Sequence, residues 1–390
     1  MKICAVIAEY NPFHLGHLKH IDYVKNNLGA EKVIVIMSGN FTQRGEPAIL
    51  DKFSRARHAV LAGADAVIEL PTVFATANAE CFARGAVNLI CDLGVVDGIC
   101  FGVESGNAEE YYSLARALNN ESKEFKNALK AHLDKGVSLA KAKFLAVSEL
   151  YSDGFNQELV SSPNNILGLE YTKALLKNQS GIAIYPMLRE GDHNDRELKK
   201  GITSATSIRE KIKAGEVKKV KGNLPPFAYK DLKGYPFAFD KIIMSALARS
   251  SEDDLRKIID CTEGLENRIK ALSKDNLSVD ALVEKVSTKR YPQTRIRRIL
   301  ASNLLGIKEK FLFDCLDSKL YAKILAVDSN KKDIISLLKE KSKVPLLTRK
   351  SDASALKKFQ EKCFEIDVLA QDLYSLATDT KINENNMLII

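Results

Sequence analysis

The sequence predicts an α/β fold, with a doubly wound parallel sheet in the first half and a second, mostly helical domain after it. Four continuous apolar runs rich in Val and Ile support this prediction, because parallel strands buried on both faces have that composition, and a fifth strand is expected after two long helical stretches. Segments with helical spacing separate the runs, and strands that alternate with helices form βαβ units. The predicted strands occupy residues 2–8, 33–39, 65–71, 96–102 and 182–188.

Helices are expected between the first four strands, at residues 52–62 and 79–93 and, before them, directly after the first strand. In that first helix, apolar residues recur every three or four positions, which is the spacing of one helix face. They are Leu15, Leu18, Ile21, Val24 and Leu28.

Two more helices are expected around the fifth strand. Ser162 would cap the one before it, with Pro163 at the first helical position, where the fixed φ of proline fits. After the strand, residues 201–216 begin as a loop rich in Ser and Thr and continue as a helix. Such hydroxyls accept backbone N–H bonds or bind an anion at the helix start.

The second half has a different pattern. Residues 220–239 are rich in Pro, Gly and aromatic residues and interrupt the helical periodicity, so the domain boundary is placed there, with domains 1–215 and 216–390. Beyond it, short amphipathic segments predict helices. They cover residues 241–250, 253–260, 265–274, 279–287, 294–306 and 333–341.

Composition limits the class of protein. Hydrophobic residues make up 45% of the chain and charged residues 28%, as in ordinary globular proteins. No signal peptide is evident and no apolar run approaches the roughly 20 residues that span a bilayer, so we expect a cytoplasmic protein without a membrane partner. The seven cysteines are scattered without a CxxC pair, which argues against a zinc site, and no protein ligands for a metal are predicted.

Net charge is distributed unevenly. The whole excess of +8 lies in the second half, since residues 1–215 contain 25 basic and 25 acidic residues and residues 216–390 contain 33 and 25. This asymmetry favours an anionic partner for the second half. A solvated, lysine-rich helical surface is the alternative.

Residues 9–20, EYNPFHLGHLKH, hold three of the six histidines. The stretch lies at the carboxyl end of the first strand and the start of a helix, where βαβ folds bind phosphates through backbone N–H groups. Gly16 leaves room for a phosphate, and His14 and His17 flank it. Both imidazoles are candidates to donate hydrogen bonds to the α-phosphate and to the leaving pyrophosphate, which is electrostatic catalysis without a covalent step.

Three alternatives for these histidines stay open. A metal site is disfavoured because His14, His17 and His20 fan across about 120° of a helix. A core role is disfavoured because the leucines of this stretch occupy the apolar stripe. Chance occurrence of so short a pattern is the third alternative, and its position directly after a buried strand argues against it.

The stretch resembles the HxGH nucleotidyltransferase superfamily, whose members bind ATP here and attack its α-phosphate with an acceptor. TSATSIR, residues 203–209, is similar to the Ser/Thr-rich phosphate loop of these enzymes, and Ser204, Thr206 and Arg209 fall on the matching positions. The loop begins with Glu9 and Tyr10 rather than with the small Gly-Ser pair common among small-molecule adenylyltransferases.

A narrower resemblance covers essentially the whole chain. AEYNPFHLGHLKH, MSGNFTQRGEPAILDKFSRARHAVLAGADAVIELP, FGVESG, SPNNILGLEY and the basic helical half together resemble the bacterial tRNA(Met) cytidine acetate ligases. The resemblance implies that acetate attacks ATP to give acetyl-adenylate and pyrophosphate, and that the acetyl group passes to N4 of the wobble cytidine of elongator tRNA(Met). It implies ATP as substrate, and magnesium is expected with it.

Carried over position by position, the resemblance implies an ATP site made of one continuous stretch and three separate residues. These are Ile7, Ala8, Glu9, Tyr10, Asn11, Pro12, Phe13, His14, Leu15, Gly16, His17, Leu18, Lys19, His20, Gly102, Asn165 and Arg189. Physically, Gly102 would let adenine or ribose approach a strand end, the Asn165 amide would offer a donor and an acceptor, and Arg189 would clamp phosphate oxygens. A turn glycine, a cap residue and a surface arginine are the alternatives.

A basic run, residues 285–298, contains six cations, one tyrosine and no acid, which suits RNA phosphates and an unstacked base. An ordinary amphipathic helix explains part of it, because Arg295 and Arg298 share one face and Ile296 another. The tRNA-binding candidates are Lys289, Arg290, Arg295 and Arg298.

Three functions are therefore weighed. An ATP-dependent RNA-modifying ligase accounts for both halves of the chain and is the predicted function. A small-molecule adenylyltransferase that releases pyrophosphate from ATP is the alternative, but it leaves the basic half without a role. An RNA-binding protein that has lost catalysis would not be expected to keep both His14 and His17.

Overall fold

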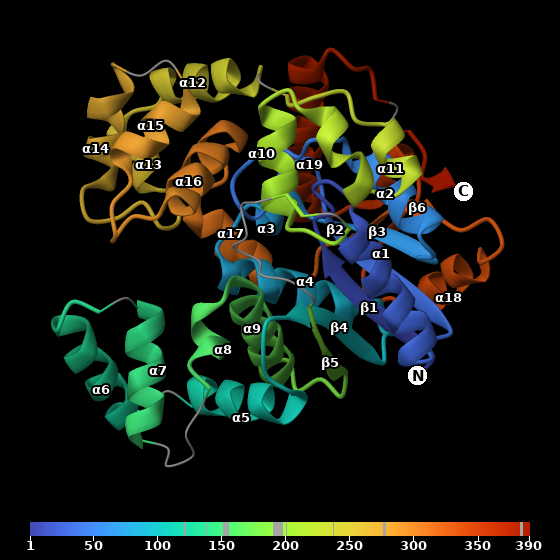
Figure 1. Ribbon diagram of the computed structural model, residues 1–390, viewed down its shortest axis with the longest axis horizontal. Helices are drawn as coiled ribbons and strands as arrows, with labels where there is room; N and C mark the ends of the chain where they lie inside the picture. Colours follow the sequence, from blue (N-terminus) through green and yellow to red (C-terminus); the bar gives the residue numbers. More distant parts are fainter. Residues whose placement is uncertain are drawn as a thin grey trace.

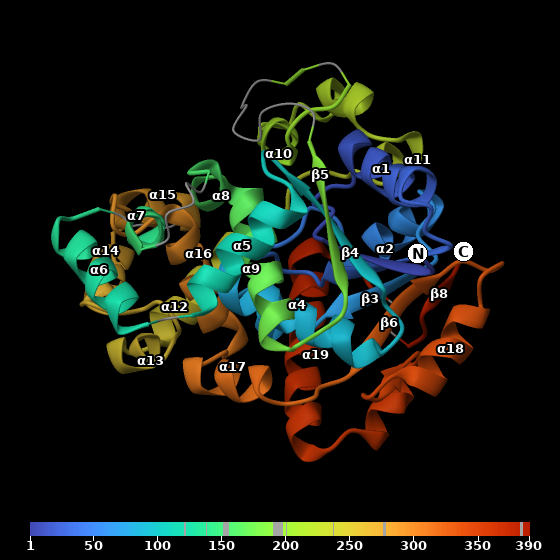
Figure 2. The same cartoon turned by 90° about the horizontal axis from the view of Figure 1, so that it is seen from below.

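A computed structural model describes residues 1–120, 122–137, 139–150, 156–189, 198–199, 201–236, 238–275, 278–382 and 385–390. One sheet runs through it, with strand order β5-β4-β1-β2-β3-β6-β7 and β8 paired to β6 (Figures 1 and 2). The five predicted strands are confirmed and pair in parallel. They are β1 (Ile3–Ala8), β2 (Lys32–Ser38), β3 (Ala66–Leu70), β4 (Gly98–Val103) and β5 (Ala183–Leu188).

The central strands are buried on both faces, as their apolar composition predicts. Ala5 and Ile34 point into one core, whereas Val6 and Val33 point into the other, because successive side chains of a strand face opposite sides. Helices α1, α2, α10 and α11 pack on the face of Val6, and α4, α5 and α9 pack on the face of Ala5. The doubly wound arrangement is therefore confirmed.

Side chains cap several helices of the first half. The Asp51 side chain accepts N–H bonds at the start of α2 and the Asn78 side chain does so for α4. Pro163 opens α9 as predicted, but the Ser162 side chain before it makes no capping hydrogen bond. These helices are α1 (Leu15–Asp22), η1 (Tyr23–Asn27), α2 (Lys52–Leu61), α3 (Thr72–Ala75), α4 (Ala79–Leu93), α5 (Ala108–Asn119), α6 (Lys123–Asp134), α7 (Leu139–Leu150), α8 (Glu158–Ser161), α9 (Pro163–Lys177) and α10 (Ala205–Lys213).

The second half is mostly helical, as predicted, and Figure 1 shows α12–α16 gathered on one side of the sheet. None of its helices in the described part of the chain, nor any in the first half, is long and apolar enough to span a bilayer. The elements are η2 (Val217–Asn223), α11 (Pro226–Lys230), α12 (Phe239–Arg249), α13 (Glu252–Arg256), α14 (Leu265–Ser273), α15 (Val279–Val286), α16 (Gln293–Leu305), α17 (Glu309–Leu316), α18 (Asp333–Lys341), η3 (Lys350–Ala355) and α19 (Lys358–Thr378).

The sequence analysis missed three strands of the second half: β6 (Ala322–Val327), β7 (Leu346–Leu347) and β8 (Leu388–Ile389). Strand β6 pairs antiparallel with β3 and so extends the sheet of the first half. The boundary predicted at residues 215/216 therefore does not separate the sheet from the rest of the chain. A short apolar run such as that of β6 does not distinguish a strand from a buried helix, and the edge of β3 that it covers lies about 255 residues away in sequence.

Buried charges join the two halves at the carboxyl end of β3. Glu69 accepts hydrogen bonds from Lys52 Nζ at 3.0 Å and lies 3.2 Å from Lys323 Nζ of β6. All three side chains are almost completely buried, so each charge is compensated inside the protein. Removal of the second half would expose this carboxylate together with the edge of β3.

The loop after β2, residues 39–48, docks on the helical half. Gly45 has a left-handed backbone, with φ of 73°, and lies directly against the backbone of α16. A side chain at this position would overlap the peptide that joins Arg297 and Arg298. Beside the contact, Arg297 pairs with Glu46 of the loop at 3.2 Å, which fixes the loop to the helix.

We expect Gly45→Ala to lower the free energy of unfolding by about 3 kcal/mol, the sum of a left-handed alanine and a backbone overlap. Gly215→Ala is the matched control, because Gly215 has φ of 76° and no atom within 4 Å of the added methyl group. Its loss should be about 1 kcal/mol. Urea denaturation of both variants measures the difference, and equal losses would contradict close docking of the loop.

Candidate functional site

The histidine loop turns sharply after β1. Tyr10 has a left-handed backbone with φ of 50°, and the Asn11–Pro12 peptide bond is cis. Helix α1 begins shortly afterwards, at Leu15. The ring of Tyr10 packs against Phe13 and edge-on against His17, with ring centroids 4.7 and 4.8 Å apart. These buried aromatic contacts hold the imidazole of His17 in one orientation.

His14 and His17 together cap the start of α1. The Gly16 N–H donates to His14 Nδ1 at 3.0 Å, and the His14 N–H donates to His17 Nδ1 at 3.2 Å. A nitrogen that accepts a hydrogen bond has no proton, so both neutral imidazoles have their proton on Nε2. The imidazole rings of His14 and His17 are stacked, with their centroids 3.7 Å apart. Gly16 permits this arrangement, since a Cβ there would lie 2.9 Å from His14 Cε1.

Electrostatics keep two of these imidazoles uncharged. Burial lowers the pKa of His17 well below the usual histidine range, and the neighbouring His14 and Arg189 lower it further. Burial, with Arg189 nearby, lowers the pKa of His20 to about 4. His17 is therefore a neutral hydrogen-bond donor at neutral pH. His20 faces β4 instead, with Nε2 3.2 Å from Cys100 Sγ.

Positive charge at the site comes from arginines. Arg209 donates to the Asn11 carbonyl at 3.0 Å and to Thr206 Oγ1 at 3.2 Å, and burial lowers its pKa. Burial also lowers the pKa of Arg189, at the end of β5. Within the described ranges, neither guanidinium has a carboxylate within 4.0 Å, so an anionic ligand would neutralise both.

The predicted phosphate loop lies beside the histidine loop. Ser204 caps α10, and its Oγ accepts from the Ser207 N–H at 3.0 Å. Ile202, just before it, is 3.6 Å from the position a Cβ of Gly16 would take. The N-termini of α1 and α10 are thus brought together, and their N–H groups add partial positive charge at the same place.

Gly102 and Asn165 have different surroundings. Gly102 lies under the side chain of Arg189, where a Cβ would be only 3.0 Å from Arg189 Cγ. Asn165 is fully buried, and its Oδ1 accepts from the Glu104 N–H at 2.8 Å while its Nδ2 donates to the Ser105 hydroxyl at 3.1 Å. We expected the Asn165 amide to meet the nucleotide, but its donors and acceptor are used to shape the loop after β4.

The sequence analysis missed Arg55 of α2. Its guanidinium is fully buried and donates to the carbonyls of Glu9 at 2.6 Å, Ser38 at 3.0 Å and Leu50 at 2.8 Å, and also to that of Gly39. It therefore joins the ends of β1 and β2. An arginine spaced with the apolar residues Ala56, Ala59 and Val60 on the buried side of α2 was the signal available in the sequence.

The basic run at residues 285–298 is partly used inside the protein. Arg295 donates to the Asp260 carbonyl at 2.8 Å, and Arg298 lies 3.7 Å from the Asp260 carboxylate with only 14% of its side chain exposed. Arg290 is exposed but pairs with Glu263, while Lys289 is exposed. Three of the four tRNA-binding candidates therefore have partners within the protein.

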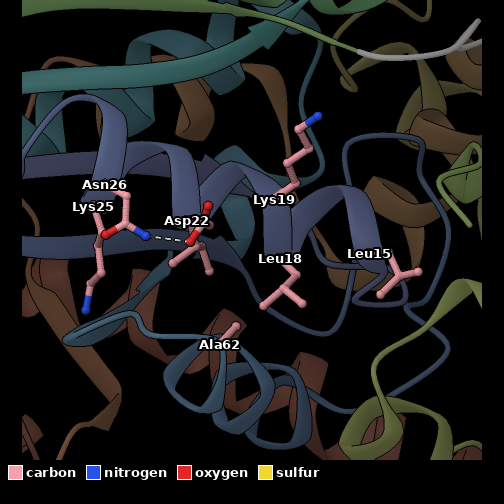
Figure 3. Close-up of a pocket in the computed structure, with 8 residues that line it drawn as sticks. Leu15, Leu18, Lys19, Asp22, Lys25, Asn26 and Ala62 are labelled. Carbon is pink, nitrogen blue, oxygen red and sulfur yellow. Dashed lines mark hydrogen bonds between the residues drawn. The ribbon is translucent and has the colours of Figure 1, made fainter.

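A cavity of about 440 Å³ lies on the outer side of α1 (Figure 3). Leu15, Leu18 and Ala62 line it, and Figure 3 shows Lys19 pointing away from Ala62. His14, His17 and Arg209 do not line it. This cavity is separate from the cluster of histidines and arginines, which is the candidate site.

Comparison with known proteins agrees with this geometry. A family model described as HIGH Nucleotidyl Transferase matches residues 1–387. A tRNA(Met) cytidine acetate ligase of Clostridium novyi (strain NT) is 38% identical, covering 96% of this chain and 95% of the relative. One from Caldanaerobacter subterraneus subsp. tengcongensis is 40% identical, covering 97% and 96%. The chain belongs to the HIGH nucleotidyltransferase family, among the tRNA(Met) cytidine acetate ligases.

Solved structures support the same family. Apo Thermotoga maritima TmcAL (form I) superposes with a TM-score of 0.93 at 31% identity, with all of both chains covered. A second form of that protein, bound with alpha-thio ATP, has a TM-score of 0.90 at the same identity and coverage. The HIGH nucleotidyltransferase fold therefore extends over the whole chain, including the β6 edge that the sequence analysis missed.

No group of three His, Cys, Asp or Glu side chains among the described residues is placed to hold a metal ion. Glu9 and Glu104 accept backbone N–H bonds from Gln43 and Asn165 respectively, at 2.7 and 3.1 Å. Magnesium stays a prediction, and it would be bound mainly by nucleotide phosphates.

The lowered pKa of His20 predicts a pH-dependent stability. Above about pH 6.5 the imidazole is neutral in both states; below it, only the unfolded chain binds the proton until about pH 4. The free energy of unfolding should thus fall by about 2 kcal/mol between pH 7 and pH 5 from this group, with His17 adding in the same direction. Urea denaturation at both pH values measures it. His20→Gln should reduce the pH dependence, and an unchanged dependence would contradict the burial argument.

Proposed function

We propose that this protein uses ATP to activate acetate as acetyl-adenylate and transfers the acetyl group to N4 of the wobble cytidine of elongator tRNA(Met). The observation that supports it most is the pair of stacked imidazoles, both with the proton on Nε2, at the start of α1. The relatives named tRNA(Met) cytidine acetate ligase and the neighbour bound with alpha-thio ATP support the choice of substrates.

In the first step an acetate oxygen attacks the α-phosphorus of ATP. The new P–O bond forms as the bond from the α-phosphorus to the bridging oxygen breaks, and pyrophosphate leaves. Negative charge grows on the leaving oxygen, so the Nε2–H groups of His14 and His17 would donate to it or to the α-phosphate. Because His17 is uncharged, it binds no extra proton and returns unchanged after the step.

Arginines would neutralise the polyphosphate. Arg209 lies between the histidine loop and the phosphate loop, through its bonds to Asn11 and Thr206, and Arg189 lies over Gly102. The N–H groups at the starts of α1 and α10 add to this field. Electrostatic complementarity of this kind needs no metal ligand from the protein, and a magnesium ion on the phosphates would act in the same direction.

In the second step the exocyclic amine of the cytidine attacks the acetyl carbonyl carbon. The C–N bond forms, the C–O bond to AMP breaks, and N4 loses one proton. A small-molecule adenylyltransferase would share the first step but would have no use for an acetyl group on RNA. The identity of the acceptor therefore distinguishes the proposed function from the alternative.

Incubation with ATP, labelled acetate and bacterial tRNA should place label in the RNA, and the label should require all three components. If no RNA is labelled and another small acid drives ATP–pyrophosphate exchange, the alternative function is favoured. Acetate-dependent exchange without RNA reports the first step alone.

Asparagine substitutions test the role of the imidazoles. His14→Asn keeps a good helix cap and His17→Asn keeps an acceptor near Nδ1, but both lose the Nε2–H donor. We expect each to lower acetate-dependent exchange by about 10² or more. His17→Gln, whose amide reaches the Nε2 position, is the control and should recover part of the rate. Wild-type exchange in both asparagine variants would exclude the proposed role.

A further inference from the structure

One short segment next to the site is strongly basic. Residues 201–236 contain eight basic and three acidic residues, a net charge of +5 in 36 residues. The segment comprises α10, η2 and α11. By contrast, the basic run at 285–298 is offset by acids of neighbouring segments, as Arg297 with Asp280 and Arg298 with Asp260 illustrate.

Two of the three acidic residues in the 201–236 segment form ion pairs within the protein. Glu216 pairs with Lys211 and Lys219, and Asp231 pairs with Arg57 and His58 of α2. Four exposed lysines of the segment form no ion pair with any residue that the structure describes. They are Lys218, Lys221, Lys230 and Lys233, and we call them the lysine surface.

The lysine surface is fixed to the histidine loop. Phe227 of α11 packs against Phe13, with ring centroids 6.0 Å apart, and against His58 at 5.7 Å. Asn223 Nδ2 donates to the carbonyls of Lys199 at 2.6 Å and Gly201 at 2.8 Å, directly before the phosphate loop. Figure 2 shows α11 beside α1 and α10 beside the end of β5. A ligand held by these lysines would therefore lie at a fixed distance from the site.

We propose that the lysine surface binds the phosphate backbone of the RNA that is acetylated, and so holds it beside the nucleotide site. This inference rests on the proposed function. Exposed ammonium groups without acidic partners suit a ligand with many regularly spaced phosphates, whose binding releases counterions. The triphosphate of ATP is a poorer match, because Arg189 and Arg209 already provide charge inside the loop and the four lysines lie outside it.

The test replaces all four lysines with glutamine. The matched control replaces Lys332, Lys339, Lys343 and Lys350, which are exposed and have no ion pair within the described ranges. Lys332 and Lys339 lie at α18, whose Asp333 pairs with Lys32 at the start of β2, the end of that strand opposite the site, and Lys343 and Lys350 follow α18 along the chain. Both quadruple variants lose the same charge, so a difference between them reports position.

We expect the lysine-surface variant to bind tRNA at least about tenfold more weakly at 0.1 M salt, with the slope of log affinity against log salt reduced by about 3. The control variant should stay within about twofold of wild type. Acetate-dependent exchange, measured without RNA, should be similar in all three proteins. Equal tRNA affinity of the two variants would overturn the proposed surface. Absence of acetylated tRNA with the wild-type protein would instead overturn the proposed function, so the two failures are distinguishable.

Discussion

The buried guanidinium of Arg55 is the constraint on which the candidate site depends. It lies under the site, where no water reaches it, and it donates to carbonyls that follow β1 and β2. An isolated buried charge costs several kcal/mol, and carbonyl oxygens with charge-assisted bonds offset that cost only if each is correctly placed. The guanidinium therefore forces Glu9 next to Gly39, and this fixes where the histidine loop begins.

Further hydrogen bonds then position the rest of the histidine loop relative to Glu9. Glu9 accepts the Gln43 N–H, which holds the loop after β2 against the loop after β1. Arg209 fastens the Asn11 carbonyl to α10. Backbone N–H groups then set the tautomers of both central histidines. The imidazoles need not be charged for the site to attract a polyphosphate, because permanent cations and helix termini supply the field. Catalysis of this kind depends on the placement of donors more than on their pKa.

The sequence predicted the parts of this arrangement that are local. Apolar segments predicted all five parallel strands, and the position of His14 and Gly16 after the first of them indicated the candidate site. The sequence did not predict the contacts between residues far apart in the chain. Strand β6 has no local signature that distinguishes it from a buried helix, and its role follows only from the open edge of β3. Asn165 looked available because the sequence does not show that the Glu104 and Ser105 N–H groups donate to its side-chain carbonyl oxygen.

The basic run at 285–298 illustrates the same limit for electrostatics. A stretch of six cations without an acid looks like a nucleic-acid surface when only its neighbours in sequence are considered. In the fold, α16 meets Asp260, Asp280 and Glu46, which come from three other segments. The segment at 201–236 has a lower density of cations, eight in 36 residues, but four of its lysines meet no such acids in the described part of the chain. Net charge along the sequence thus becomes informative about partners only after intramolecular pairs have been removed, and the cations that then remain include four lysines next to the histidine loop.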